Sequence, residues 1–169
     1  GMDVSGITSQ TLYYNGTNWV ATSNVANNGT TVTTDADMTV NGITVGTGAG
    51  TGSYNTVLGQ YASSSSTDGW ANSSIGYRAL SDNTTGYGGT ALGYNALTDN
   101  TTGLLNTAVG YVSLYQNTTG KMNNASGAYA LFKNNGDYNT ASGYNSLIYS
   151  TTGSYNTGIG YQALYTNTT

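Results

Sequence analysis

One glycine recurs every 17 residues through about the last two thirds of this 169-residue chain. The series is Gly59, Gly76, Gly93, Gly110, Gly127, Gly143 and Gly160, in which a single interval is 16 residues. A second series keeps the same step, at Gly52, Gly69, Gly86, Gly103, Gly120, Gly136 and Gly153. Together they delimit seven similar units over residues 52–169. Self-similarity at a fixed short period indicates one structural unit stacked many times.

Each unit approximates Asn-Thr-Ala-Val-Gly-Tyr-x-Ala-Leu-x-x-Asn-Thr-Thr-Gly-x-x, most cleanly at residues 106–122. Seventeen residues are too few for a helical hairpin, and the glycine, asparagine and β-branched content disfavours helix. We therefore predict an all-β fold, a parallel β-solenoid of seven 17-residue coils stacked about 4.8 Å apart. The shorter unit has lost a residue at Asn134-Asn135-Gly136, in the turn, where a stack best tolerates deletion.

Side chains alternate between the two faces of a strand, so the residues of each unit fall into two sets. Thr107, Val109 and Tyr111 share a bulky face, and Ala108 and Gly110 share a small one. We predict that the bulky face points into the coil. The alanine and glycine face then lies outside along the full length of the stack, where it would let another chain approach closely.

Leu114 follows Val109 at an odd offset, so the chain has to bend between them. We predict two short strands in each coil, with a corner after the tyrosine and a turn at Asn-Thr-Thr-Gly whose glycine has a positive φ. Ser126 and Ser142 replace aliphatic residues at the inward position, which predicts a softer core there. Stacking predicts three ladders: Leu58, Ile75, Leu92, Val109 and Ile159; Leu80, Leu97, Leu114, Leu131, Leu147 and Leu164; and Asn83, Asn100 and Asn117.

The composition excludes most catalytic chemistry, because the chain has no His, Cys, Glu or Pro. Zinc, haem and iron–sulfur sites, thiol nucleophiles and imidazole bases all lack their side chains, so we predict no catalytic residue, cofactor or metal. A net charge of −4 with only three Lys and Arg argues against nucleic acid and anionic membrane as partners. No segment approaches the roughly 20 apolar residues that a membrane-spanning helix needs, so we expect no direct membrane insertion.

A coil of this length buries about one aliphatic side chain per strand, so its own core is thin. Small cores commonly need support, and without cysteine or metal the available support is association of identical chains. We therefore expect several copies of the chain to associate around an axis parallel to the stack.

The stretch Asn-Thr-Ala-Val-Gly-Tyr at residues 106–111, with variants at residues 55–59, 139–143 and 156–160, resembles the Asn-Ser-Val-Ala-Ile-Gly repeat of YadA-type heads in trimeric autotransporter adhesins. The fuller Gly-Tyr-x-Ala-Leu-x-x-Asn-Thr-Thr-Gly form also resembles repeats of phage tail-fibre and related bacterial surface proteins. The resemblance implies a left-handed β-roll and an intertwined or side-by-side homotrimer. It also implies an extracellular location, on the bacterial cell surface or in a virion tail fibre. The 17-residue unit is longer than the usual head repeat.

Residues 1–48 precede the repeats and read as a small β module, with the solenoid at 49–169. Residues 11–20 predict a hairpin about an Asn-Gly turn, and residues 30–45 predict more strand with a second Asn-Gly turn. Trp19 with Tyr13 and Tyr14 either packs under the hairpin or stacks on a sugar. Asp35 and Asp37 form a turn-edge pair or, alternatively, the carboxylates of a glycosidase. The glycine-rich residues 46–52 predict a boundary turn, since the third glycine is misplaced for a dinucleotide-binding loop.

The two residues after each turn glycine vary most between units, and we call them the turn stripe. They are Ser53-Tyr54, Trp70-Ala71, Tyr87-Gly88, Leu104-Leu105, Lys121-Met122, Asp137-Tyr138 and Ser154-Tyr155. The stripe is either a seam between chains or a contact surface for a cell-surface glycan or protein receptor. On the second interpretation the candidate ligand-binding residues are Trp70, Tyr87, Leu104, Tyr138 and Tyr155.

Asp82 and Asp99 occupy the same place in successive units and would stack, which suggests either a calcium site or a solvated face. Gln116 and Lys133 follow at that place, which favours the solvated face. The last unit stops at Asn167-Thr168-Thr169, inside the turn, so we expect the chain to be a piece of a longer fibre.

The pattern as a whole predicts a non-enzymatic segment of a trimeric surface or virion fibre. Such a segment would act in adhesion or host-receptor recognition, or as a rigid spacer. The alternatives are an ice-binding solenoid, suggested by the threonine content, and a fragment of a polysaccharide-degrading tailspike.

Overall fold

The computed structural model describes residues 11–14, 19–22, 25–27, 32–34 and 38–40 as strands, and residues 43–167 with their side chains. These residues form thirteen strands and no helix. The chain divides into two compact units, Gly1–Met38 and Thr39–Thr169. In the described part of the chain, no helix is long and apolar enough to cross a membrane.

The first unit contains two antiparallel strand pairs. Strand β1 (Thr11–Tyr14) pairs with β2 (Trp19–Thr22), which confirms the strands of the predicted hairpin. Strand β3 (Val25–Asn27) pairs with β4 (Val32–Thr34). The two Asn-Gly turns, the side chains of Tyr13, Tyr14 and Trp19, and the Asp35 and Asp37 pair lie outside the described residues.

The second unit is built on a nine-stranded sheet in the order β13-β12-β11-β10-β9-β8-β7-β6-β5. It begins with β5 (Met38–Val40) and β6 (Ile43–Gly46), and β6 pairs antiparallel with the first repeat strand. The repeat strands are β7 (Thr56–Gly59), β8 (Ser73–Ile75), β9 (Thr90–Leu92), β10 (Thr107–Val109), β11 (Asn124–Ser126), β12 (Thr140–Ser142) and β13 (Thr157–Ile159).

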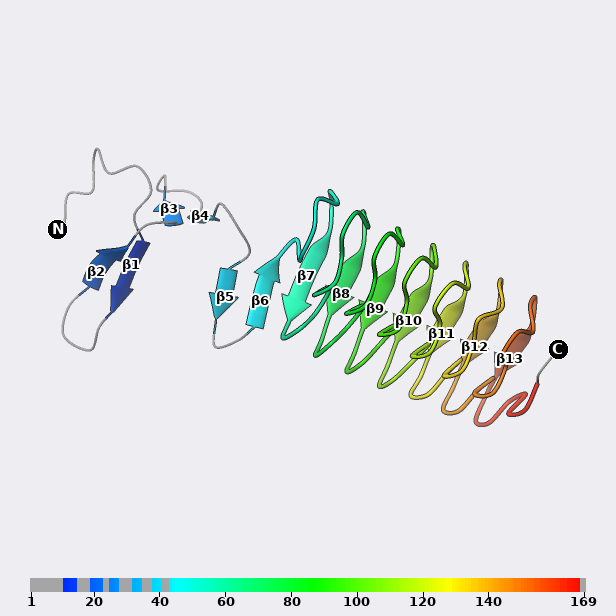
Figure 1. The fold of residues 1–169 in the computed structure, drawn as a ribbon. Helices are drawn as coiled ribbons and strands as arrows, with labels where there is room; N and C mark the ends of the chain where they lie inside the picture. Colours follow the sequence, from blue (N-terminus) through cyan, green and yellow to red (C-terminus); the bar gives the residue numbers. More distant parts are fainter. Residues whose placement is uncertain are drawn as a thin grey trace. The chain divides into compact units, whose positions relative to one another are not determined.

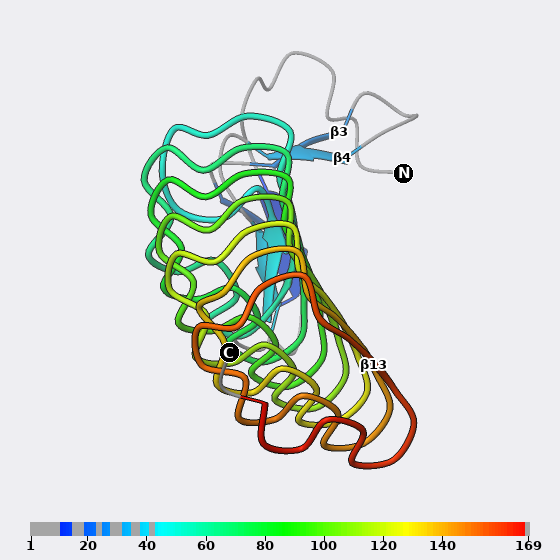
Figure 2. The same cartoon turned by 90° about the vertical axis from the view of Figure 1, so that its right-hand side faces the viewer.

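The repeat strands pair in parallel, each one 17 or 16 residues from the next. Thr107 in β10, for example, lies opposite Thr90 in β9 and Asn124 in β11. The result is a parallel β-solenoid of about six turns, which confirms the predicted fold class. Figure 1 shows the coils side by side along the stack, and Figure 2 shows their narrow, elongated cross-section.

Each coil contains one short strand rather than the two that the sequence predicts. The chain returns through turns in which non-glycine residues adopt positive φ, as Asn95 (51°), Leu97 (53°) and Leu105 (55°) do in one coil. Backbone hydrogen bonds alternate in direction along this return. Asn95 donates to the Tyr77 oxygen of the preceding coil at 2.9 Å, and Leu97 donates to the Ser113 oxygen of the following coil at 3.0 Å. The coils therefore remain bonded to each other where no strand is present.

The predicted assignment of the two strand faces is wrong. The alanines of the strands are buried, Ala91 being 1% exposed, whereas the neighbouring Leu92 is 44% exposed. Leucines from the opposite side of the coil, including Leu97 and Leu114, are fully buried in one cluster with these alanines, so most strands have a small residue inside, with the larger Val57 in β7. The aliphatic row therefore points outward, and Ser126 and Ser142 lie on the surface rather than at inward positions.

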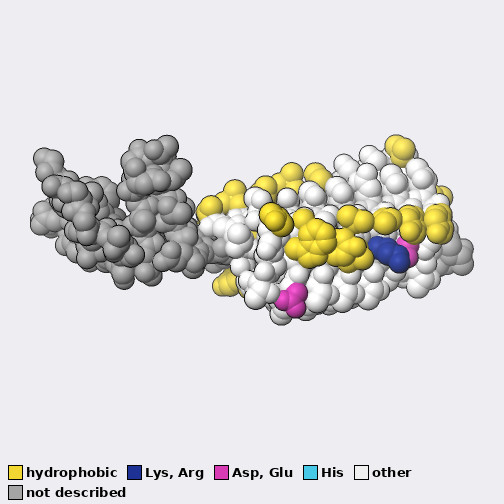
Figure 3. All heavy atoms as spheres, turned by 90° about the horizontal axis from the view of Figure 1, so that it is seen from above, with side chains coloured by type: hydrophobic (Ala, Val, Ile, Leu, Met, Phe, Trp, Pro, Cys, Tyr) yellow, Lys and Arg dark blue, Asp and Glu magenta, His cyan; other side chains and the backbone are white. Residues whose placement is uncertain are grey.

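The predicted leucine and asparagine ladders are confirmed inside the coil. The core cluster contains Leu80, Leu97, Leu114, Leu131 and Leu147, together with the alanines Ala79, Ala91, Ala96, Ala108, Ala125, Ala130 and Ala141. Leu164 is exposed. At the surface, hydrophobic side chains form rows that run along the stack (Figure 3).

The two glycine series serve different purposes. Glycines before the tyrosine have positive φ, 136° at Gly110, and a Cβ there would lie 2.6 Å from the carbonyl oxygen of Gly127 in the next coil. The predicted positive φ at the turn glycines is wrong, because Gly103 and its equivalents do not have it. A Cβ at Gly103 would instead clash with the side-chain oxygen of Asn100 and with the carbonyl oxygen of Gly120 in the next coil, and it would lie 2.9 Å from Asn106 Nδ2. Crowding by the backbone of the next coil and by the buried asparagines thus requires glycine at the turn.

Candidate functional site

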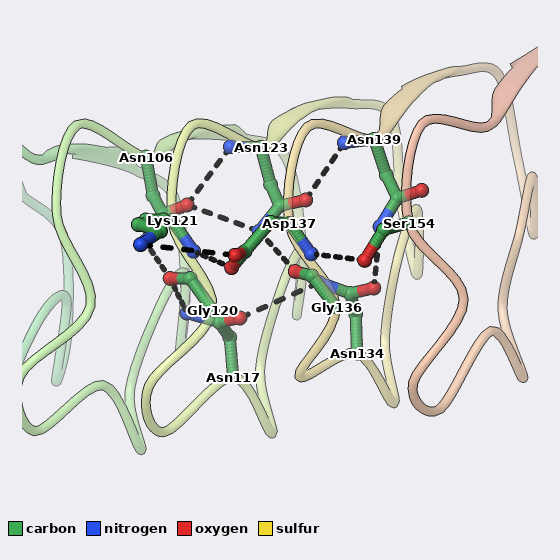
Figure 4. A network of polar contacts seen from close by, with 10 residues as sticks. All are labelled: Asn106, Asn117, Gly120, Lys121, Asn123, Asn134, Gly136, Asp137, Asn139 and Ser154. Carbon is green, nitrogen blue, oxygen red and sulfur yellow. Dashed lines mark hydrogen bonds and ion pairs between the residues drawn. The ribbon is translucent and has the colours of Figure 1, made fainter.

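Two ladders of buried asparagine hold the turn that precedes the turn stripe. In the first ladder, Asn100 Nδ2 donates to Asn83 Oδ1 at 2.9 Å and Asn117 Nδ2 donates to Asn100 Oδ1 at 3.0 Å. Each side chain also closes its own turn, as Asn117 Nδ2 does on the Gly120 oxygen at 2.9 Å (Figure 4). All three are at most 1% exposed, so the glycosylation sequons that they begin are inaccessible in the folded chain.

The second ladder lies between the stripe and the strand, and sequence reasoning missed it. Asn123 N–H donates to Asn106 Oδ1 at 3.0 Å, and Asn139 N–H donates to Asn123 Oδ1 at 2.9 Å (Figure 4). Asn106 Nδ2 donates to the carbonyl oxygen of Gly120, the turn glycine of the next coil, at 2.7 Å. The signal was present, because asparagine recurs with the 17-residue step three places after the turn glycine. The two ladders fix the backbone on both sides of each turn glycine.

The structure separates the five candidate ligand-binding residues into two stacked pairs and one leucine. The Trp70 and Tyr87 rings stack with centroids 4.6 Å apart and planes 11° apart. Tyr138 and Tyr155 stack at 4.9 Å and 5°. Leu104 is half-buried. The two pairs belong to different places in the turn stripe, since Trp70 and Tyr87 directly follow the turn glycine and the other two come one residue later.

The two pairs do not form one site. Two coils lie between those of Tyr87 and Tyr138, and the stripe there contains Lys121, whose charged atom lies 3.9 Å from that of Asp137 in the next coil. Figure 3 shows such a charged pair within a row of hydrophobic side chains. The stripe is therefore divided into an aromatic part near β8 and another near β13.

A surface depression of about 250 Å³ lies beside the first pair. Its lining residues are Thr51, Gly52, Ser53, Tyr54, Asp68 and Trp70. Sequence reasoning singled out Trp70 but not Asp68 or Thr51, which come from the turns of two successive coils. Thr51 Oγ1 donates to Asp68 Oδ1 at 2.7 Å, so the carboxylate is fixed at the rim of the depression.

The outward row of the strands forms a second exposed surface. We define the outer face as this row together with the tyrosines that follow the strands. The aliphatic members are Leu58, Ile75, Leu92, Val109 and Ile159, and the tyrosines are Tyr61, Tyr77, Tyr94, Tyr111, Tyr129, Tyr144 and Tyr161. The tyrosine rings form a continuous ladder, with Tyr77, Tyr94 and Tyr111 stacked at 5.3 and 5.2 Å.

Ionisable groups are few and no group of three or more His, Cys, Asp or Glu among the described residues could hold a metal ion. Burial raises the pKa of Asp99, the charge of Asp82 raises it further, and Arg78 partly offsets both effects. Tyr149 raises the pKa of Tyr165, and desolvation beside Tyr111 raises the pKa of Tyr129. None of these groups lies in the depression.

Comparison with known proteins gives no relative for this chain. No family model, no curated protein and no solved structure matches it. The resemblance to trimeric adhesin heads and tail fibres stays a prediction from the repeat.

Proposed function

We propose that this chain is a non-enzymatic segment of a trimeric extracellular fibre, of a bacterial surface or a virion, acting in adhesion or host-receptor recognition or as a rigid spacer. The observation that carries the proposal is the outer face. A soluble monomer rarely exposes an apolar surface that continues along its whole length. Here leucine and isoleucine lie in register in the first coils, with Leu58, Ile75 and Leu92 each more than a third exposed. Ser126 and Ser142 interrupt the aliphatic row in two later coils, where the tyrosines alone continue the apolar surface.

The outer face is suited to contact with a copy of itself. Its residues are uncharged at neutral pH, so two such faces meet without repulsion. Its rows repeat with the coil spacing, so parallel copies would present matching ridges at every coil. In this proposal seven left-handed coils per chain pack as an intertwined or side-by-side homotrimer, and the outer face replaces the alanine face as the seam.

A rigid trimeric rod also suits attachment. Three identical chains present every surface site three times, and several weak contacts made together give strong adhesion. The stacked backbone hydrogen bonds would transmit force along the rod without a large core.

The solution mass, measured by light scattering, tests the proposal. We expect three times the chain mass of 17.4 kDa. Leu92→Asp should yield the single-chain mass, because it places a charge in the seam. Thr85→Asp adds the same charge on the exposed turn and should leave the trimer mass unchanged. A single-chain mass for the unmodified protein at micromolar concentration would overturn the proposal.

Ice binding is a second candidate, favoured by one specific observation. The strands place Thr56, Thr90, Thr107, Thr140 and Thr157 in one row beside the aliphatic residues of the outer face. Ser73 and Asn124 interrupt the row. Thermal hysteresis of the chain at micromolar concentration would support this candidate, and freezing without hysteresis would remove it.

A further inference from the structure

We propose that the depression beside Trp70 is a binding subsite for one neutral pyranose unit of a glycan. The inference deepens the proposed function, since it rests on the solenoid acting in recognition, and it names the ligand class and the residues that contact it. Three features of the depression support the subsite: the end of the aromatic stack, the polar groups at the rim, and the charge of Asp68.

Among the residues that the structure describes, the ring stack ends at Trp70. Tyr87 covers one face of the Trp70 ring with the centroids 4.6 Å apart, and no described ring stacks on the other face. The same place in the preceding coil is occupied by Ser53, which has no ring to continue the stack. Trp70 is accordingly 48% exposed, and the depression lies between it and Ser53.

A sugar ring fits a place that a stacked aromatic ring would otherwise occupy. Successive coils lie about 4.8 Å apart, which is close to the spacing at which flat rings pack against each other. Tyr54, at 87% exposed, adds a second ring to the wall of the depression. Aromatic side chains offer a sugar an apolar surface at little entropic cost, because few of their torsions have to be fixed.

Polar groups of two coils converge on the same depression. Asp68 is held by the Thr51 hydroxyl at 2.7 Å, and Thr51 Oγ1 also lies 3.3 Å from the Thr67 oxygen. The backbone under Asp68 is fixed as well, since Asp68 N–H and Gly69 N–H both donate to the Thr84 oxygen, at 3.0 and 3.1 Å. A carboxylate held in this way is a strong acceptor for sugar hydroxyls.

The charge of the site selects the class of sugar. Of the described residues that line the depression, Asp68 alone is charged, and the chain has a net charge of −4. Sialic and uronic acids would be repelled, whereas neutral hexoses and N-acetylhexosamines would not. The pair Tyr138 and Tyr155 makes no such site, because the nearby carboxylate of Asp137 is paired with Lys121.

Saturation-transfer NMR on the 169-residue chain tests the subsite, with methyl glycosides of galactose, glucose, mannose and N-acetylglucosamine at millimolar concentration as probes. We expect at least one of the four to bind. Trp70→Ala should weaken that binding about tenfold or more, which corresponds to the loss of one good stacking contact. Asp68→Asn should weaken it by a smaller factor, and Tyr155→Ala is the matched control that leaves it unchanged.

Ser53→Trp provides a variant that does not remove any native contact. Ser53 is exposed, so a larger side chain has room there, and its ring would continue the stack over Trp70. We expect it to abolish binding while the protein stays folded. Absence of binding to all four glycosides, or binding that survives both Trp70→Ala and Ser53→Trp, would overturn the inference.

Light scattering on the same samples separates this inference from the proposed function. A trimer that binds no neutral glycoside refutes the subsite and leaves the fibre. A single-chain species that binds through Trp70 refutes the fibre and leaves the subsite.

Discussion

Gly89 is the one interruption of the second asparagine ladder between Asn55 and Asn156. Its N–H donates to Asn72 Oδ1 at 2.7 Å, as the asparagines of other coils do. Its φ lies outside the positive region, so its backbone is open to any residue. A Cβ there would lie 3.1 Å from Asn72 Oδ1 and 3.7 Å from Leu97 Cδ2, so only a small shift of the Asn72 amide is needed. The position lacks a side-chain amide that the rest of the ladder has.

Gly89→Asn should therefore stabilise the solenoid. The new amide would donate to the Gly103 oxygen, as Asn106 Nδ2 does to Gly120, and loss of glycine would reduce the entropy of the unfolded chain. We expect the free energy of unfolding to rise by about 1 kcal/mol, measured by urea denaturation. Gly89→Ala isolates the entropy effect and should give a smaller gain. An asparagine variant no more stable than the alanine variant would contradict the proposed hydrogen bond.

At the scale of the coil, the 17-residue period predicts which residues of successive coils stack on one another, but it does not predict which face of the strand points into the core. Leu97 and Asn100 recur with the step of the repeat and belong to ladders as predicted, and both are buried. Alternation along the strand gives two faces without saying which is inside. The larger size of Val109 favoured placing it inside the coil. Leucines from the opposite side, such as Leu114, occupy that interior instead, and the small Ala108 is the strand residue that faces them. The depression beside Trp70 was not predictable either, because it depends on how two turns lie side by side.

Asp82 and Asp99 occupy equivalent positions in two successive coils. Burial and the Asp82 charge both disfavour the ionised form of Asp99 in the fold, so its folded pKa lies above the ordinary value of 3.8. Between these two pKa values the folded chain binds more protons than the unfolded chain, so stability falls as pH rises through this window. Above the window the ionised carboxylate destabilises the fold.

Asp99→Asn should therefore be more stable than the unmodified chain at pH 7, by a modest amount because the side chain is partly solvated. The difference should vanish below pH 3.8, where Asp99 is protonated in both states. Thermal unfolding followed by circular dichroism between pH 3 and pH 7 measures both. Asp82→Asn should give part of the gain, because it removes one of the two causes. A gain from Asp99→Asn that is the same at pH 3 and pH 7 would show that the charge is not its origin.

At the scale of the whole solenoid, each coil contacts only the coils on either side. Stability is then close to a sum of terms for single coils and for neighbouring pairs. Both the backbone bonds and the asparagine ladders follow this rule, since they join neighbouring coils, as Leu97 N–H does to the Ser113 oxygen and Asn100 Nδ2 does to Asn83 Oδ1. The natural 16-residue unit shows that a change confined to the turn is absorbed, because Asn134 still donates to Asn117 Oδ1 at 3.4 Å.

Deleting residues 104–120 should consequently leave a folded, shorter solenoid. The deletion joins Gly103 to Lys121, which occupies the position of the removed Leu104 in its coil. Leu97 would then stack on Leu131, and Asn100 on Asn134. We expect an unchanged circular dichroism signal per residue and a lower midpoint of thermal unfolding, because one coil and one pair of coil contacts are lost. Deleting residues 104–112 removes about half a coil and brings polar turn residues to the places of the buried alanines and leucines. That variant should not fold cooperatively, and equal stability of the two deletions would contradict a stack held together coil by coil.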